Sequence, residues 1–159
     1  MATHSYKTTL DWSGSTGSGY DEYSRTHRVE LGGVSGGLVL SSDAAFLGSS
    51  ELANPEQLLL AAASSCQLLA FLALAARSRV DVLAYRDSAE AIMPEDITPM
   101  RITAITLRPQ IAVNAGTDPE RVKRLVEKAH QGCFIANSLN TDVSLEPTIE
   151  VGELAGDRT

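Results

Sequence analysis

Cysteine is scarce in this chain of 159 residues, which has two, Cys66 and Cys133. A small extracellular domain stapled by disulfides needs more of them, and no secretory leader is expected, so that class is excluded. Short Cys/His spacings of the zinc type are also lacking, and we expect no metal and no bound cofactor. In the cytoplasm, where we place this protein, two reduced thiols are core residues, a redox pair or metal ligands.

Basic residues are also few compared with acidic ones. Lysine and arginine number 13 against 20 acidic residues, and the net charge is −7. The basic residues are scattered, so nucleic acid and anionic membranes are excluded as partners. The 43% of hydrophobic residues is enough for a core, and the length predicts one domain over residues 1–159.

One long apolar stretch predicts a central helix over residues 54–78. Asn54 can cap it, Pro55 suits its first position, and Glu56 places negative charge in its first turn. The stretch is apolar nearly all round, which predicts burial on most sides. Its length would also allow a membrane span, but polar residues interrupt its middle, and we expect a helix of a soluble protein. These residues are Ser64, Ser65 and Gln67.

Cys66 lies in the middle of this predicted helix. Its neighbours at three and four residues are mostly alanines, which leave room for a second element or a small ligand to approach the sulfur. They are Ala62, Ala63, Leu69 and Ala70. On this evidence alone a structural buried cysteine is the commoner alternative.

The N-terminal region, residues 1–50, is predicted to be β-structure, with strands over residues 6–12, 23–31 and 38–40. In the second strand, alternation places Arg25 and His27 on the same face as Val29. An edge strand whose long side chains reach solvent is the ordinary interpretation of this pattern.

Residues 82–151 predict strands at 82–93, 101–113 and 143–151, with a bend at Pro109. A helix capped by Asp118 ends near Gly132, and a short helix follows from Cys133. The tail, residues 152–159, is predicted to be frayed. Because strands and helices do not alternate regularly, we expect an α+β fold with largely antiparallel sheet.

Two cysteine environments are predicted. Cys133 at a helix N-terminus would have a lowered thiol pKa. Cys66 would need a nearby cation, and arginine is the best one because it is permanently charged and forked. Arg25 is our choice, with Arg28 in reserve. His130 is either a base or, more commonly for its position, an exposed residue at a helix end.

The chain contains two cysteine motifs, Asn54-Pro55-Glu56-Gln57-Leu58 with Ala63-Ser64-Ser65-Cys66, and Ala129-His130-Gln131-Gly132-Cys133 with Asn137-Ser138. In this order they resemble the signature of the OsmC/Ohr family of thiol-dependent peroxidases, and Tyr23-Ser24-Arg25 resembles the N-terminal strand motif of the broader OsmC-like branch. The similarity spans about residues 20–150. Phe134 and Gln67 replace the proline and the aromatic residue of the organic-hydroperoxide branch, so the resemblance is to the general OsmC-like group.

The resemblance implies curved sheets around two central helices in an intertwined homodimer. It implies reduction of an organic hydroperoxide by Cys66, resolution by Cys133, an acidic partner Glu56, and recycling by an external dithiol or lipoyl-type reductant. The alternative is a non-catalytic dimeric module that binds a small apolar ligand in the same cleft.

The spacing of Glu56 and Cys66 adds an expectation about assembly. Ten helical residues are a rise of about 15 Å, too far for one arginine to bridge within a chain. No glycine or proline breaks the stretch between them. We therefore expect Glu56 to come from a second subunit, rather than only to cap its own helix.

Overall fold

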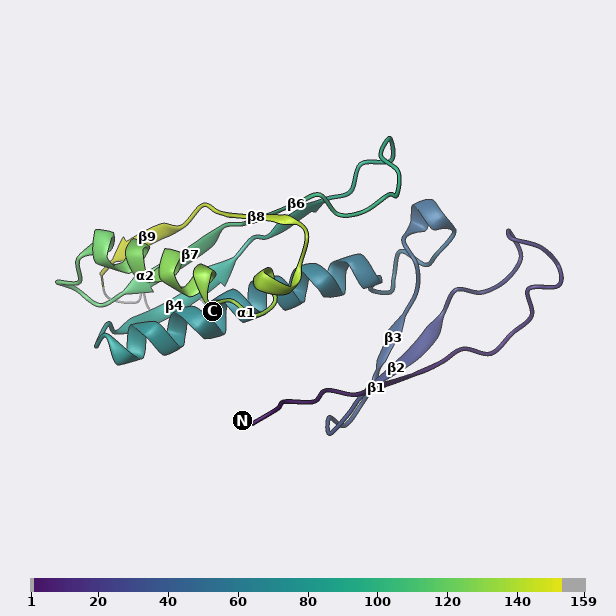
Figure 1. Ribbon diagram of the computed structural model, residues 1–159, viewed down its shortest axis with the longest axis horizontal. Coiled ribbons are helices and arrows are strands. Elements are labelled where there is room, and N and C mark those ends of the chain that lie inside the picture. Colours follow the sequence, from purple (N-terminus) through teal and green to yellow (C-terminus); the bar gives the residue numbers. More distant parts are fainter. Residues whose placement is uncertain (1, 153–159) are drawn as a thin grey trace, which may run out of the picture. The chain divides into compact units, whose positions relative to one another are not determined.

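The first part of the chain is a three-stranded antiparallel sheet of order β1-β2-β3. The computed structural model describes residues 2–152, and the chain divides into two compact units, Met1–Leu58 and Leu59–Thr159. One domain over residues 1–159 stays a prediction, and the predicted tail lies, apart from Gly152, outside the described residues. The elements of the first unit are β1 (Thr8–Asp11), β2 (His27–Leu31), β3 (Leu38–Leu40) and η1 (Ala44–Phe46) (Figure 1).

Strand β2 is shorter than the predicted strand over residues 23–31. The carbonyls of Tyr20 and Tyr23 accept hydrogen bonds from the Arg25 side chain, so this segment turns back on itself before it joins the sheet. The predicted alternation persists, since Tyr23, Arg25 and His27 are all half-buried. The edge-strand interpretation was wrong, because β2 is the middle strand.

Helix α1 (Pro55–Arg77) begins where the sequence predicts. Asn54 accepts a hydrogen bond from the Gln57 N–H at 2.8 Å, and the Gln57 side chain accepts one from the Asn54 N–H at 3.1 Å. This reciprocal capping satisfies two backbone donors at once. The cap is therefore made by Asn54 and Gln57, and not by Glu56.

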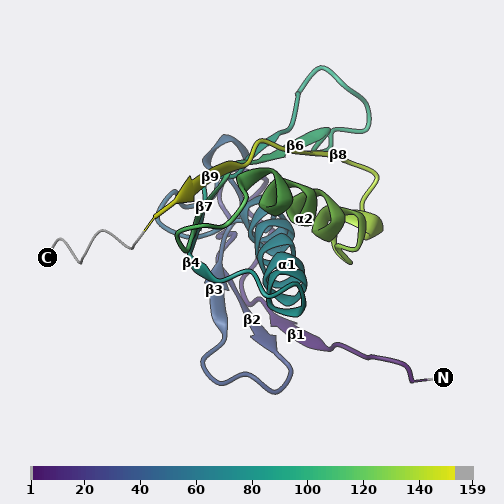
Figure 2. The ribbon, with the colours of Figure 1, turned by 90° about the vertical axis from the view of Figure 1, so that its left-hand side faces the viewer.

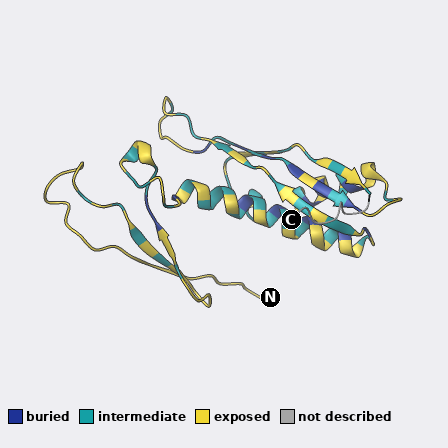
Figure 3. Cartoon of the chain, turned by 180° about the vertical axis from the view of Figure 1, so that it is seen from behind, coloured by how far each residue is buried: buried dark blue, intermediate teal, exposed yellow. Residues whose placement is uncertain are grey.

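Within its own chain α1 is buried along one stripe only, so burial on most sides is not reached by a single chain and stays a prediction for the assembly. Its buried residues recur every four positions, which places them on one face of the helix. They are Ala63, Gln67, Phe71 and Ala75. Much of the rest of α1 is exposed in Figure 3, and Leu69 is 63% exposed.

By length and composition α1 could cross a membrane, but the polar groups in its middle bond to neighbouring elements. Ser64 Oγ donates to Asp87 Oδ2 at 2.5 Å, and Gln67 Nε2 donates to the Val126 carbonyl at 3.1 Å. These contacts fit the predicted central helix of a globular fold.

Over residues 59–152 the second unit has six strands in two three-stranded sheets, of orders β4-β7-β9 and β5-β6-β8. In the described residues the two pairs with β8 and β9 are parallel, and the other four pairs of the molecule are antiparallel. The elements are β4 (Val82–Asp87), β5 (Glu90–Ile92), β6 (Ala104–Leu107), β7 (Pro109–Val113), α2 (Pro119–Gln131), η2 (Ala136–Ser138), β8 (Asp142–Leu145) and β9 (Thr148–Val151).

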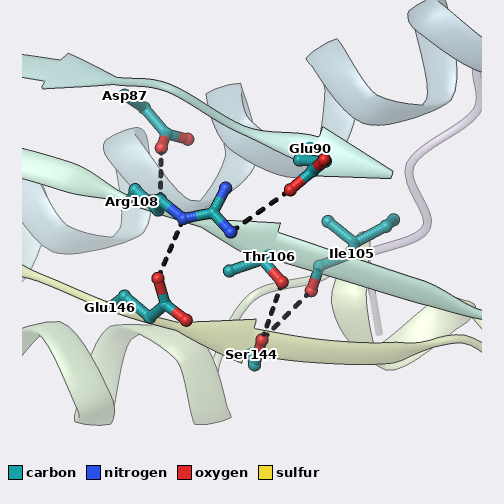
Figure 4. Close-up of polar contacts among 7 residues, drawn as sticks. All are labelled: Asp87, Glu90, Ile105, Thr106, Arg108, Ser144 and Glu146. Carbon is teal, nitrogen blue, oxygen red and sulfur yellow. Dashed lines mark hydrogen bonds and ion pairs between the residues drawn. The ribbon is translucent and has the colours of Figure 1, made fainter. Parts of the chain in front are cut away.

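Each of the three long strands predicted in this unit is divided by a bend into two short strands. One short strand of each pair belongs to the sheet β4-β7-β9 and the other to the sheet β5-β6-β8. The bend at Pro109 was predicted, but those within residues 82–93 and 143–151 were not. Arg108 joins the bends: its N–H donates to Asp87 Oδ1 at 2.7 Å, and its guanidinium bonds Glu146 at 2.8 Å and Glu90 at 3.2 Å (Figure 4).

Helices α1 and α2 lie side by side on one face of these sheets (Figure 2). Ile111 and Val113 of β7 pack with Phe71 of α1 and with Val122 and Val126 of α2 in one buried cluster. The buried residues of α2 are three or four positions apart, so they lie on one face of the helix. They are Val122, Val126 and Ala129. The packing thus fixes α1 and α2 against one another and against β7.

Candidate functional site

The two cysteines lie next to each other in the second unit. Both are free; Cys66 is half-buried on α1, and Cys133, just beyond the end of α2, is 1% exposed. The Cys66 side chain helps to raise the pKa of the Cys133 thiol, and the N–H of Ile135, two residues beyond Cys133, donates to Cys66 Sγ at 3.5 Å. Two thiols that are 67 residues apart in the sequence therefore lie near each other.

The end of α2 turns the chain toward Cys66. Gly132 caps α2, and the Cys133 N–H bonds to the His130 carbonyl at 3.0 Å. The Asn137 side-chain amide then donates to the carbonyls of Gln131 at 3.0 Å and Cys133 at 2.8 Å. These bonds hold both sides of the turn that carries Cys133.

The pKa of the Cys133 thiol is raised, so the prediction of a lowered value was wrong. Burial is the largest cause, and the hydrogen bond and charge of Cys66 add to it. Backbone N–H groups of Ala136 and Ile135 act in the opposite direction but do not outweigh the loss of solvation. Cys133 is thus a neutral thiol at neutral pH.

The space beside Cys66 that its alanine neighbours leave is occupied by residues 133–135. The backbone N–H of Ile135 donates to Cys66 Sγ at 3.5 Å. Ile135 also packs against the cluster that contains Ala63, one turn before Cys66 on α1. The second element that the small residues predicted is this turn.

Arg25 lies in the wall of a cavity of about 420 Å³ in the first unit. Its guanidinium donates to the carbonyls of Tyr23 at 2.7 Å and Tyr20 at 2.5 Å, and lies 4.0 Å and 4.8 Å from the centres of the same two rings. The cavity wall is mostly apolar and is lined by Leu10, Trp12, Thr16, Tyr23, Arg25, His27, Ser41, Ser42 and Pro55.

Arg28, the reserve choice, is exposed and pairs with Glu30 of its own strand at 3.3 Å. Glu56 is half-buried in the first turn of α1, and α1 is continuous from there to Cys66. The structure thus brings the two cysteines together. The roles of Arg25 and Glu56 stay predictions.

Sequence reasoning missed several groups around the cysteines. His130 is half-buried with an unpartnered Nδ1, rather than exposed, and its spacing from Val126 on α2 is the signal that could have shown this. No sequence pattern could have predicted the hydrogen bonds made by the Asn137 side chain and the Ile135 N–H, because these bonds depend on how the turn after α2 folds. Within residues 2–152 no cluster of three His, Cys, Asp or Glu side chains could hold a metal.

Comparison with known proteins identifies the family. A family model described as OsmC-like protein matches residues 48–148. An OsmC-like protein of unknown function from Vibrio cholerae is 28% identical with a TM-score of 0.82, and the match covers 92% of this chain and 100% of that one.

More distant structures share the fold. An organic hydroperoxide resistance protein OsmC from Legionella pneumophila is 19% identical with a TM-score of 0.71, over 95% of this chain and 100% of that one. The organic hydroperoxide resistance protein OhrB of Bacillus subtilis is 21% identical with a TM-score of 0.63, over 92% and 100%. No curated protein sequence matches the chain. With the paired cysteines and the α+β fold, the family match shows that this chain belongs to the OsmC-like family.

Proposed function

We propose that this protein is a thiol-dependent reductase of organic hydroperoxides. The observation that carries the proposal is the adjacency of two free thiols, of which Cys66 is the more accessible and Cys133 is buried. The names of the Legionella and Bacillus structures support it. We further propose a cytoplasmic location, where thiols are kept reduced, and neither nucleic acid nor membrane as a partner.

The reaction needs both sulfurs. The Cys66 thiolate attacks the terminal oxygen of the hydroperoxide, an S–O bond forms as the O–O bond breaks, and the alkoxide takes a proton to leave as an alcohol. The Cys133 thiol then displaces water from the Cys66 sulfenic acid and forms a disulfide. An external dithiol of the lipoyl type reduces it by two successive exchanges.

The different burial of the two thiols fits a reaction in which Cys66 attacks the peroxide first and Cys133 reacts second. Since burial raises the pKa of Cys133, that thiol stays neutral and does not compete with Cys66 for the peroxide. The Cys133 sulfur is nevertheless already beside the atom that it must attack. The apolar side chains around the pair favour an alkyl hydroperoxide over hydrogen peroxide.

The experiment is a peroxidase assay with cumene hydroperoxide and dihydrolipoamide. We expect consumption of both in equal amounts, and slower turnover of hydrogen peroxide.

The second candidate, a dimeric module that binds a small apolar ligand, is favoured by the apolar cavity in the first unit. It predicts saturable binding of cumyl alcohol with no consumption of peroxide.

We propose that the active form is a homodimer. Outside the Ala63–Ala75 stripe α1 exposes apolar residues such as Leu69 and Leu72, and the sheet β1-β2-β3 also leaves Leu10 and Val39 exposed. A second copy of this chain would cover such surfaces. It would also supply Glu56 to a Cys66 that is about 15 Å away along its own continuous helix.

Leu69→Asp tests the dimer. A carboxylate on the outer face of α1 would be buried without a partner, so the dimer should dissociate at micromolar concentration. Sedimentation velocity measures this, with Ala115→Asp in an exposed turn as the matched control. A parent protein that is monomeric, or a Leu69→Asp variant that stays as dimeric as the parent, contradicts the proposal.

Arg25→Ala tests the proposed cation at Cys66. The guanidinium keeps N–H groups beyond those bonded to Tyr20 and Tyr23, and we propose that these bind the thiolate. Alkylation of Cys66 by iodoacetamide at neutral pH should therefore slow several-fold, with unchanged circular dichroism. Arg28→Ala, which only breaks the surface pair with Glu30, should alkylate at the parent rate; the reverse pattern would identify Arg28 instead.

A further inference from the structure

Cys66 cannot obtain a backbone hydrogen bond from its own helix. In the middle of α1 every N–H already donates to the carbonyl four residues earlier. A thiolate there needs a donor from another element, or it is poorly solvated in apolar surroundings. Among the described residues, the Ile135 N–H is the one backbone donor to Cys66 Sγ.

We propose that the backbone N–H of Ile135 is a catalytic group that stabilises the Cys66 thiolate. This proposal rests on the proposed function, in which that thiolate is the nucleophile. At 3.5 Å from N to S, the group already touches the reacting atom in the reduced protein. No side-chain motif encodes it, because any residue except proline supplies the same N–H.

The surrounding contacts fix this N–H before the peroxide arrives. The Ile135 side chain packs against the buried cluster of Ala63, Ile102, Ile105 and Leu107. Its carbonyl accepts the Ser138 N–H at 2.9 Å. A donor held in this way needs no rearrangement when charge develops on the sulfur, which is what makes fixed dipoles effective.

A backbone donor favours the ionised form of a thiol, and the accompanying loss of nucleophilicity is smaller because the Brønsted coefficient is about 0.4–0.5. A donor at this position would therefore speed attack on the peroxide. The turn over residues 133–135 contains both the Ile135 N–H donor and the proposed resolving residue, Cys133.

Ile135→Pro removes the N–H and little else from the backbone. The φ angle of Ile135 is −68°, close to the value that proline requires. Ile135→Val is the matched control, because it shortens the side chain but keeps the N–H. Both are made in a Cys133→Ser background, so that alkylation by iodoacetamide reports on Cys66 alone.

We expect Cys66 in Ile135→Pro to alkylate about tenfold more slowly at neutral pH, in line with the loss of one charge-assisted hydrogen bond. The pH profile of alkylation should move to higher pH, and Ile135→Val should match the parent. Equal slowing in both variants would mean that side-chain packing acts and not the N–H, and no slowing in either would also overturn the proposal.

If Ile135→Pro does not fold, an amide-to-ester replacement at residue 135 provides the same test, because it deletes only the N–H. The alkylation readout does not depend on peroxide. A parent protein that consumes no peroxide would refute the proposed function, whereas unchanged alkylation without the N–H would refute this inference alone.

Discussion

Cys66→Ser is expected to lower consumption of cumene hydroperoxide to the rate of a reaction without protein. Serine keeps the size and position of the side chain, but its hydroxyl is not ionised at neutral pH and does not form a sulfenic acid. Cys66 is also the more accessible sulfur, so Cys133 cannot take over the first step.

A second variant, Cys133→Ser, separates attack on the peroxide from formation of the disulfide. Cys133→Ser should consume about one equivalent of peroxide per chain and then stop at the sulfenic acid, which a dimedone adduct detects. Ser65→Ala, an exposed neighbour on the same helix, is the matched control and should keep full activity. A Cys66→Ser protein that turns over like Ser65→Ala would end the peroxidase proposal.

The second large effect is complementation between two inactive variants, Glu56→Ala and Cys66→Ser. In the proposed dimer each site combines Cys66 of one chain with Glu56 of the other. A mixed dimer therefore contains one intact site and one site that lacks both residues. We expect purified mixed dimers to have about half of the parent activity, since two-fold symmetry gives two equivalent sites.

The experiment needs proof that mixing occurred. Differently tagged variants are denatured, refolded together and purified through both tags, and each variant refolded alone serves as the control. If Glu56 acts within its own chain, both sites of the mixed dimer are defective and no activity returns. That outcome, with mixed dimers in hand, excludes a shared site.

The helices could be predicted from sequence because their signals are local. Asn54 and Asp118 cap α1 and α2, and Gly132 ends α2, as the pattern indicated. Those short-range contacts depend only on residues within one turn of each other. The bends of the long strands were harder to predict, because the contacts at them join residues far apart in the sequence, such as Arg108 with Asp87 and Glu146.

The sequence indicated that Cys66 and Cys133 belong to one candidate site, but it did not indicate the electrostatics of that site. The motifs identified Cys66 and Cys133, and the small neighbours of Cys66 indicated that another element approaches it. The raised pKa of Cys133 comes from burial by distant parts of the chain, which overrides the local effect of a helix start. The Ile135 N–H bond likewise arises only when the turn after α2 packs on α1.

The central claim is that Cys66 and Cys133 act as a redox pair, and intact-mass spectrometry after titration with cumene hydroperoxide tests it most directly. One equivalent of peroxide should remove two hydrogens per chain, and peptide mapping should show a Cys66–Cys133 disulfide within one chain that dihydrolipoamide reverses. A chain whose mass is unchanged after excess peroxide, or whose cysteines gain oxygen atoms without ever forming that bond, would contradict the account.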